Sequence, residues 1–256
     1  MIQFEPVHVL FSIAGIEIYV WGLMFVVAFL LSFLLAWRAS RNKLEEKHFF
    51  NIVILILVGA IVGARLLYVF INFSYYLEKP LRILAFSEGG SSSFGGFLAL
   101  LFVWLYVKKH KLNFGAILDF FAPYVVLALA IGRIGCFLNW CCYGIPTTAP
   151  WAVQVQGVAR HPTQLYLLLT NLVVFFIILR LQKKKEWGSK GILNFDGALF
   201  LFFLLYYSIA RFLIDFLREY EISELFLGLA ISQWFSLAFI VFSITLLLII
   251  RGKLKS

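Results

Sequence analysis

The sequence has very few charged side chains. Only 14% of its 256 residues are Asp, Glu, Lys or Arg, and 62% are hydrophobic, whereas about a quarter of residues are charged in ordinary soluble domains. Mean hydropathy is +0.94. This composition indicates an integral membrane protein and excludes a soluble domain of any size. The net charge of +9 does not require nucleic acid as a partner, because membrane proteins carry excess Lys and Arg in their cytoplasmic loops.

Cysteine is also scarce. The three cysteines lie at 136, 141 and 142, no C-x-x-C pair exists, and the four histidines are scattered along the chain. A zinc site built from these cysteines and His161 has little support, because neither spacing matches a common ligand pattern. We therefore expect no metal, and we expect the cysteines to be small apolar residues near a helix end. The spacing leaves a disulfide open.

A basic stretch of the kind that begins a signal peptide is missing before Ile18. The first apolar run is instead followed by Arg38, Arg41 and Lys43, which favours a retained helix. Seven segments are apolar enough to be expected in the membrane: 18–37, 49–73, 97–107, 117–138, 164–181, 197–217 and 227–250. They predict a single all-α integral membrane domain over residues 1–256, with seven transmembrane helices and no internal repeat.

Positive charge is distributed unevenly between the two sides of these segments. Lys and Arg concentrate after the first, third, fifth and seventh segments, whereas the other connections hold only Lys79, Arg82, Arg160 and Arg218. The positive-inside rule then places the N-terminus outside and the C-terminus in the cytoplasm. Two connecting segments consequently face outside, a Gly-rich one at 87–96 and a polar one at 139–162.

Three arginines lie inside predicted spans: Arg65, Arg133 and Arg211, each in the outer half of the membrane. An ionised side chain at membrane depth costs at least ~2.5 kcal/mol, so it persists where it is paired or binds something. Asp215, four residues after Arg211, is placed to neutralise it, but no carboxylate is similarly placed for the other two. The surplus favours an anion, and lipid phosphate suits the paired donors of guanidinium groups.

Two structural alternatives remain open for these arginines. Their side chains can extend to outer headgroups, or they can bond backbone carbonyl groups. The segment IGRIGCFLNWCCYG, which contains Arg133, also permits a packing role. Its residues Gly132, Gly135, Cys136 and Asn139 share one helical face, where small residues let another helix approach closely. Backbone amides of the run 89–96 are weaker candidates for anion donors.

Several motifs together resemble one family. GRIGCFLNWCCYG is similar to the signature G-R-[IL]-G-[NC]-F-x-N-G-x-x-x-G of the prolipoprotein diacylglyceryl transferases. Other blocks that fit this family follow in order along nearly the whole chain: WGLM at Trp21, GAR at Gly63, PL followed by GGSSSFGG, DFFAP at Asp119, PWAV at Pro150, RHPTQLY at Arg160, the RF…D…RE block at Arg211, and Gln233.

The resemblance implies a multi-pass protein of the bacterial cytoplasmic (inner) membrane. Such enzymes transfer the diacylglyceryl group of phosphatidylglycerol to the lipobox cysteine thiol of a prolipoprotein, forming a thioether and releasing glycerol phosphate. The implied partners are this lipid and the prolipoprotein signal peptide, without nucleic acid or cofactor. The catalytic residues implied are Arg133, Arg211 and Asp215. The substrate-binding residues implied are Arg65, Tyr68, Gly95, Gly96, Gly132, Asn139, Gly144, His161 and Gln164.

The chain is a divergent member by this comparison. Phe94 stands where the family usually has His or Tyr, Trp140 where it has Gly, Leu167 where an acid is frequent, and Trp21 where Tyr is frequent. Because Phe94 cannot accept a proton, another base is needed, such as His161 or a phosphate oxygen. Two other functions stay open: a non-catalytic paralogue that binds anionic lipid or lipoprotein signal segments, and an ion or solute pathway.

Overall fold

The computed structural model describes residues 2–13, 16–71, 73–79, 82–83, 97–186 and 195–255. The chain divides into two compact units. Unit 1 contains Met1–Ala36 and Gly115–Ser256, and unit 2 contains Trp37–Phe114. The boundary falls within helix α1 (Val20–Ser40).

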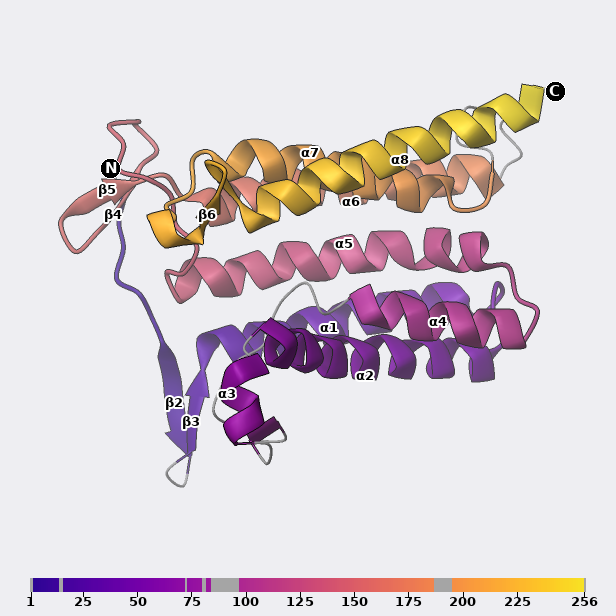
Figure 1. The fold of residues 1–256 in the computed structure, drawn as a ribbon, viewed down its shortest axis with the longest axis horizontal. Helices are drawn as coiled ribbons and strands as arrows, with labels where there is room; N and C mark the ends of the chain where they lie inside the picture. Colours follow the sequence, from indigo (N-terminus) through magenta and orange to yellow (C-terminus); the bar gives the residue numbers. More distant parts are fainter. Residues whose placement is uncertain are drawn as a thin grey trace. The chain divides into compact units, whose positions relative to one another are not determined.

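Unit 1 is built mainly from long apolar helices. Besides most of α1 it holds α5 (Phe114–Leu138) from Gly115 onward, α6 (Thr163–Glu186), α7 (Ala198–Asp215) and α8 (Ile231–Lys255). Helices α6, α7 and α8 run side by side (Figure 1). The core joins three helices, through Val126 of α5, Ile178 of α6 and Phe203 of α7. A buried carboxylate fastens two of them, because Asp119 on α5 accepts a hydrogen bond from the Phe200 amide in the first turn of α7 at 3.0 Å.

Unit 2 contains α2 (Glu46–Ile71), the short α3 (Phe73–Glu78) and α4 (Phe97–Lys109). Helices α2 and α4 approach closely at Gly59, where an added Cβ would lie 2.7 Å from the Ala99 Cα. Near the other end, the Tyr106 hydroxyl bonds His48 Nδ1 at 2.8 Å and accepts from Asn51 at 2.9 Å. The small residue Gly59 thus sets the spacing between α2 and α4, as expected for membrane helices.

Six helices in the described part of the chain are long and apolar enough to cross a membrane: Val20–Ser40, Glu46–Phe70, Phe114–Leu138, Thr163–Lys184, Ala198–Asp215 and Ile231–Ile250. The protein is thus a mainly helical, multi-pass membrane protein. The predicted segment at 97–107 forms α4, but this helix has 13 residues. At 1.5 Å per residue it is about 20 Å long, against a hydrocarbon core of about 30 Å. The prediction of seven spans is therefore not confirmed.

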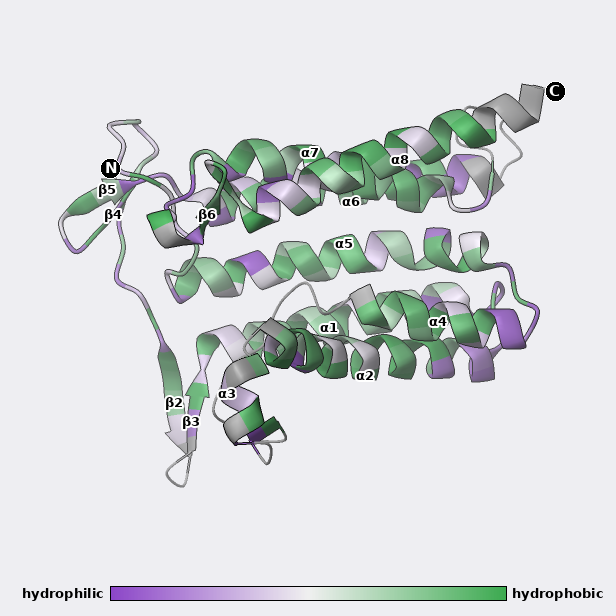
Figure 2. Cartoon of the chain, in the orientation of Figure 1, coloured by the Kyte–Doolittle hydropathy of each residue, from purple (hydrophilic) through white to green (hydrophobic). Residues whose placement is uncertain are grey.

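The exterior of these helices is apolar, as expected for contact with lipid. Figure 2 shows hydrophobic residues along the lengths of the helices and hydrophilic residues mainly towards their ends. On α8, for example, Val241 is 64% exposed and Leu248 is 63% exposed. Side chains of this kind on the outside are costly in water and favourable in a bilayer.

Short strands join the helices in unit 1, although the sequence predicts an all-α protein. In one small sheet, β4 (Val153–Val155) pairs in parallel with β1 (Ile2–Gln3) and antiparallel with β5 (Val158–Arg160). In another, β2 (Val9–Ile13) pairs antiparallel with β3 (Ile16–Tyr19). A hairpin of β6 (Leu225–Phe226) and β7 (Leu229–Ala230) precedes α8. Its turn holds Leu227 and Gly228 at φ 51° and 79°. The predicted start of the last span at Leu227 is therefore wrong, because the turn delays the helix to Ile231.

Candidate functional site

Arg133 lies near the C-terminal end of α5, five residues before the helix ends at Leu138, and its side chain is half-buried. Its guanidinium is within hydrogen-bonding reach of the Tyr207 hydroxyl on α7, with the thiols of Cys136 and Cys142 nearby. Within the part of the chain that the structure describes, no carboxylate pairs with it. A tyrosine hydroxyl satisfies only a small share of the five N–H donors of a guanidinium.

Arg211 lies on α7, one turn beyond Tyr207. Its Nε is 3.1 Å from Oδ2 of the fully buried Asp215, which confirms the ion pair that the spacing predicts. The same carboxylate oxygen accepts from the Ser232 hydroxyl at 2.6 Å, and this hydroxyl lies 3.1 Å from that of Tyr220. Arg211 Nη1 is nevertheless buried without a hydrogen-bond partner. Asp215 therefore fixes one side of the guanidinium and leaves a donor on the other side open.

Arg218 is a third cation in this region, three residues after Asp215. Its guanidinium lies over the Tyr220 ring at 4.7 Å, and its Nε is buried without a partner. The sequence places Arg218 in an outer connection, outside the predicted site. Its near-i+4 spacing from Asp215, on the stripe that includes Arg211, was the pattern that could have identified it.

Gly144 is the point where three segments of backbone meet. Its amide donates to the His161 carbonyl at 2.8 Å, and it forms a β-bridge with Arg218. A Cβ added at Gly144 would lie 2.5 Å from the Leu217 carbonyl oxygen and 2.6 Å from the His161 Cβ. Only glycine fits there. This meeting of three backbone segments, which we call the Gly144 crossing, fixes the backbone positions of Arg218 and His161.

Two side chains in the first turn of α6 donate hydrogen bonds to the backbone of the segment that follows α5. Thr163 donates from its hydroxyl to the Cys142 carbonyl at 2.6 Å, and Gln164 Nε2 donates to the Cys141 carbonyl at 2.8 Å. Gln164 is fully buried, yet its Oε1 has no partner. Asn139 has a different partner, because its Oδ1 lies 2.9 Å from Nδ1 of His8. These two residues are 131 positions apart in the chain. No local sequence pattern points to His8 as a site residue.

His161 is half-buried and has a defined neighbour. Its Nδ1 is 2.9 Å from the Tyr166 hydroxyl, which also accepts a hydrogen bond from the Trp151 indole at 2.8 Å. This pair leaves Nε2 as the nitrogen available to another group. The hydroxyl can either donate to Nδ1 or accept from it, so the contact is compatible with both neutral tautomers.

Three of the residues that depart from the family pattern, Trp140, Leu167 and Trp21, fit their local surroundings. Trp140 has φ 51°, a left-handed conformation that glycine adopts without cost, and its ring is 5.7 Å from that of Phe4 and 5.8 Å from that of Tyr143. Leu167 is only 2% exposed. Trp21 is 44% exposed and packs edge-on against Phe25, with ring centroids 4.5 Å apart. Aromatic and apolar packing thus stabilise these substitutions.

Two glycines of α5 differ in their surroundings. A Cβ at Gly135 would lie 2.8 Å from the Met24 Cβ, so this glycine serves the packing of α1 against α5. A Cβ at Gly132 would have no neighbour within 4 Å. The packing seam predicted for this face is therefore present at Gly135, whereas Gly132 borders open space next to Arg133.

The remaining predicted site residues belong to unit 2. Arg65 is buried, and its guanidinium donates to the backbone carbonyls of Arg82 at 2.6 Å and Ile83 at 3.0 Å. This is the carbonyl-bonding alternative that the sequence left open. Tyr68 is half-buried beside Tyr76, with ring centroids 6.4 Å apart. Gly95, Gly96 and Phe94 lie outside the described residues.

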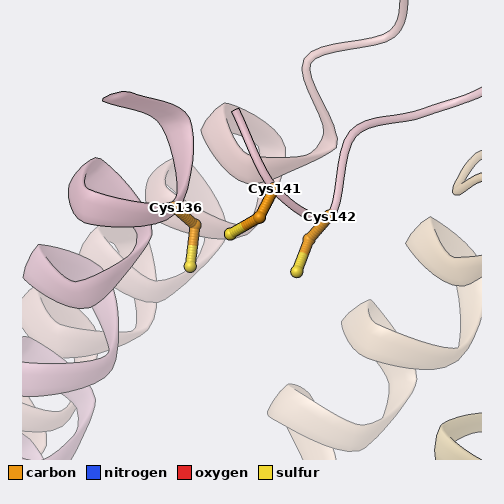
Figure 3. Close-up of side chains that lie close together, drawn as sticks. All are labelled: Cys136, Cys141 and Cys142. Atoms are coloured by element: carbon orange, nitrogen blue, oxygen red, sulfur yellow. The ribbon is translucent and has the colours of Figure 1, made fainter. Parts of the chain in front are cut away.

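The three cysteines come together next to Arg133. All are free thiols, and their sulfur atoms lie within 4.8 Å of one another (Figure 3). Hydrogen bonds from the thiols of Cys136 and Cys141, together with the charges of Arg218 and Arg133, hold the pKa of the Cys142 thiol below its ordinary value. This is the only group of three metal-ligating side chains among the described residues.

The arrangement defines a class of protein. It is a multi-pass membrane protein in which Arg133, Arg211 and Arg218 lie in one region of unit 1. Asp215 pairs with Arg211, and buried guanidinium donors on Arg211 and Arg218 have no partner. Open donors and surplus positive charge at low dielectric favour an anion with several acceptor oxygens, such as a phosphate.

Comparison with known proteins identifies the family. Residues 8–249 match the family model described as prolipoprotein diacylglyceryl transferase. Curated proteins named phosphatidylglycerol–prolipoprotein diacylglyceryl transferase are similar to this chain over nearly their whole length. The protein from Campylobacter jejuni is 37% identical over 96% of this chain and 93% of its own, and that from Idiomarina loihiensis is 34% identical over 98% and 95%. The protein from Finegoldia magna is 33% identical over 93% and 94%. The chain belongs to the prolipoprotein diacylglyceryl transferase family.

Proposed function

We propose that this protein transfers the diacylglyceryl group of phosphatidylglycerol to the lipobox cysteine thiol in the signal peptide of a prolipoprotein. The observation that carries this proposal is the pair of open, buried guanidinium donors on Arg211 and Arg218, in the same region as Arg133. A phosphodiester headgroup supplies the acceptor oxygens and the negative charge that these donors lack.

The reaction is a substitution at carbon. The thiol loses its proton to a base, and its sulfur forms a bond to the glycerol carbon that carries the phosphate. The bond between this carbon and the phosphate oxygen breaks, and its electron pair leaves with glycerol phosphate. Negative charge grows on the departing phosphate, so donors aimed at that group stabilise the transition state more than the ground state.

Each site residue then has a role. Arg133 and Arg211 hold the phosphate and stabilise its developing charge, and Asp215 orients Arg211 through their 3.1 Å contact. The pocket is shaped by Gly132, Asn139, Gly144 and Gln164. In unit 1, His161 is a substrate-binding residue and also the candidate base. In unit 2, the residues proposed to bind substrate are Arg65, Tyr68, Gly95 and Gly96.

We also propose the topology in which the reaction takes place. The protein lies in the bacterial cytoplasmic membrane as a single seven-span domain with its N-terminus outside and its C-terminus in the cytoplasm. Helix α4 contributes the seventh crossing. Residues 87–96 and 139–162 face outside, so lipid enters from the outer leaflet. The unequal distribution of Lys and Arg between alternate connections supports this orientation.

Purified protein in vesicles tests the function directly. Phosphatidylglycerol vesicles with a lipobox peptide should yield the thioether-linked diacylglyceryl peptide by mass spectrometry, with one glycerol phosphate released per peptide modified. Vesicles of phosphatidylethanolamine, or a peptide with serine in place of the lipobox cysteine, should yield neither product. Binding of phosphatidylglycerol without release of glycerol phosphate would instead identify a non-catalytic paralogue.

Asp215→Asn is expected to separate positioning from binding. The amide keeps the volume of the carboxylate but removes its charge, so Arg211 loses its fixed orientation while the site becomes more positive. We expect kcat to fall about 10- to 100-fold because a misplaced donor stabilises the transition state less. KM for phosphatidylglycerol should stay unchanged or fall. Both constants come from initial rates of glycerol phosphate release.

Asp119→Asn is the matched control, since Asp119 is also a buried acid, and its carboxylate accepts a hydrogen bond from a helix amide. It should lower the melting temperature and leave both constants close to those of the parent protein. A rise in KM without a change in kcat for Asp215→Asn would contradict the orienting role.

His161→Gln is expected to lower kcat about 100-fold, because glutamine cannot accept the thiol proton and general base catalysis typically contributes ~10²-fold or more. Tyr166→Phe, which removes only the hydroxyl next to Nδ1, should have a smaller effect. Full activity of His161→Gln would assign the proton to another acceptor, such as a phosphate oxygen of the lipid.

A further inference from the structure

The cysteine cluster is organised by the backbone around it. Cys136 lies in the last turn of α5, and the turn that follows returns Cys141 to it, with the Cys141 amide donating to the Cys136 carbonyl at 3.0 Å. Trp140 and Cys142 adopt left-handed conformations, with φ of 51° and 63°. Each such residue costs of order 1 kcal/mol, so the surrounding structure must impose the turn. The hydrogen bonds from Thr163 and Gln164 to the two cysteine carbonyls supply that restraint.

The three sulfur atoms are spaced closely enough to share one metal ion. A Zn–S bond is about 2.3 Å long, so tetrahedral geometry places thiolate ligands roughly 3.8 Å apart. The observed separations reach at most 4.8 Å, and side-chain rotation alone supplies the remaining adjustment. In Figure 3 the three side chains extend towards the same small region from the helix end and the turn. Cys141 and Cys142 are half-buried, which gives an ion a route from the surface.

The charge around the cluster also suits thiolate ligands. Arg133 lies near Cys136 and Cys142, and Arg218 lies near Cys142. Three thiolates around a divalent ion carry one net negative charge, which these cations compensate. Gln164 adjoins the cluster through the backbone, because its Nε2 donates to the Cys141 carbonyl.

We propose that Cys136, Cys141 and Cys142 bind one thiophilic metal ion, of the Zn²⁺ or Cu⁺ class, through three thiolates and with the fourth position open. Soft thiolate ligands select these ions over the hard cations Mg²⁺ and Ca²⁺. The cluster contains every cysteine of the chain and excludes His161, so it differs from the four-residue zinc site that the sequence offers. The site does not depend on the transfer reaction proposed above.

Metal titration of the full-length protein in detergent tests this proposal. After reduction and removal of bound metal, the protein should bind one equivalent of Zn²⁺ in competition with a chromophoric chelator. Co²⁺ should give an intense thiolate-to-cobalt charge-transfer band in the ultraviolet. A parallel titration with Cu⁺ shows which of the two ions the site prefers. Each of Cys136→Ser, Cys141→Ser and Cys142→Ser should weaken binding by at least about 10- to 100-fold.

His161→Gln is the control in the same titration and should bind metal like the parent protein. Size-exclusion profiles and helical circular dichroism identify any serine variant that fails to fold. Thiol alkylation of the parent protein provides a second readout, because bound Zn²⁺ should protect all three cysteines together. Reduced protein that binds no stoichiometric metal would overturn the proposal, whether its thiols stay free or form a disulfide on oxidation. Metal binding unaffected by the serine substitutions would overturn it as well.

Discussion

Arg133→Ala is expected to abolish measurable diacylglyceryl transfer, with kcat lower by about 10²- to 10³-fold or more. The residue is a half-buried cation within reach of Tyr207, with no carboxylate partner among the residues described. Removing a single donor to a developing anionic charge typically costs ~10²- to 10³-fold in rate. Arg133 in addition carries a full charge in a low-dielectric environment. Glycerol phosphate release from phosphatidylglycerol vesicles measures the loss.

Arg133→Lys distinguishes charge from geometry. Lysine keeps the positive charge but lacks the planar fork that bonds two phosphate oxygens at once. We expect an intermediate activity, roughly 10- to 100-fold below that of the parent protein. Arg180→Ala removes the same side chain from an exposed position towards the far end of α6 and should be fully active. Activity of Arg133→Ala within about tenfold of the parent protein would remove Arg133 from the catalytic residues.

Gly144→Ala is expected to damage both the stability and the activity of the protein. The added Cβ would lie 2.5 Å from the Leu217 carbonyl oxygen and 2.7 Å from that of His161. Both are backbone atoms that side-chain rotation cannot relieve. Overpacking of this kind costs about 1–3 kcal/mol. The backbone segments that would shift also carry Arg218 and His161, and a displacement near 1 Å costs about 10²-fold in rate. Thermal unfolding in detergent and kcat/KM measure the two effects.

Gly22→Ala is the matched control for this substitution. Gly22 lies within α1, and an added Cβ there would have no neighbour within 4 Å. Alanine at a helical position of this kind is favoured over glycine by about 0.5–1 kcal/mol, so the control should be at least as stable as the parent protein. Gly144→Ala with the unfolding temperature and kcat/KM of the parent protein would show that the crossing tolerates a side chain.

Features set by local composition could be predicted from the sequence. Long apolar runs give six helices that can cross a membrane, because burying backbone in lipid requires internal hydrogen bonding. The Arg211–Asp215 pair follows from i,i+4 spacing and is present at 3.1 Å. The apolar run at 97–107 is real but forms a helix of 13 residues. Apolar composition identifies such a segment without fixing its length.

Features that depend on contacts between distant residues could not be predicted. His8 bonds Asn139, and Gly144 bonds His161, across separations that no sequence period encodes. The cysteine cluster depends on left-handed conformations at Trp140 and Cys142, which residues other than glycine rarely adopt. The partners of Arg65 are likewise two backbone carbonyl groups, and their positions depend on the tertiary structure. In each case tertiary structure overrides the local pattern.

The crossing at Gly144 has a consequence for how the protein is made. It requires backbone atoms of residues 144, 161 and 217, which leave the ribosome at well-separated times. Helices α5 and α6 can enter the bilayer before residue 217 is synthesised, but the crossing cannot close until α7 has followed. Non-local contacts of this kind form late. A nascent chain stopped ahead of Leu217 would therefore be inserted in the membrane yet lack the assembled region that we propose binds phosphate.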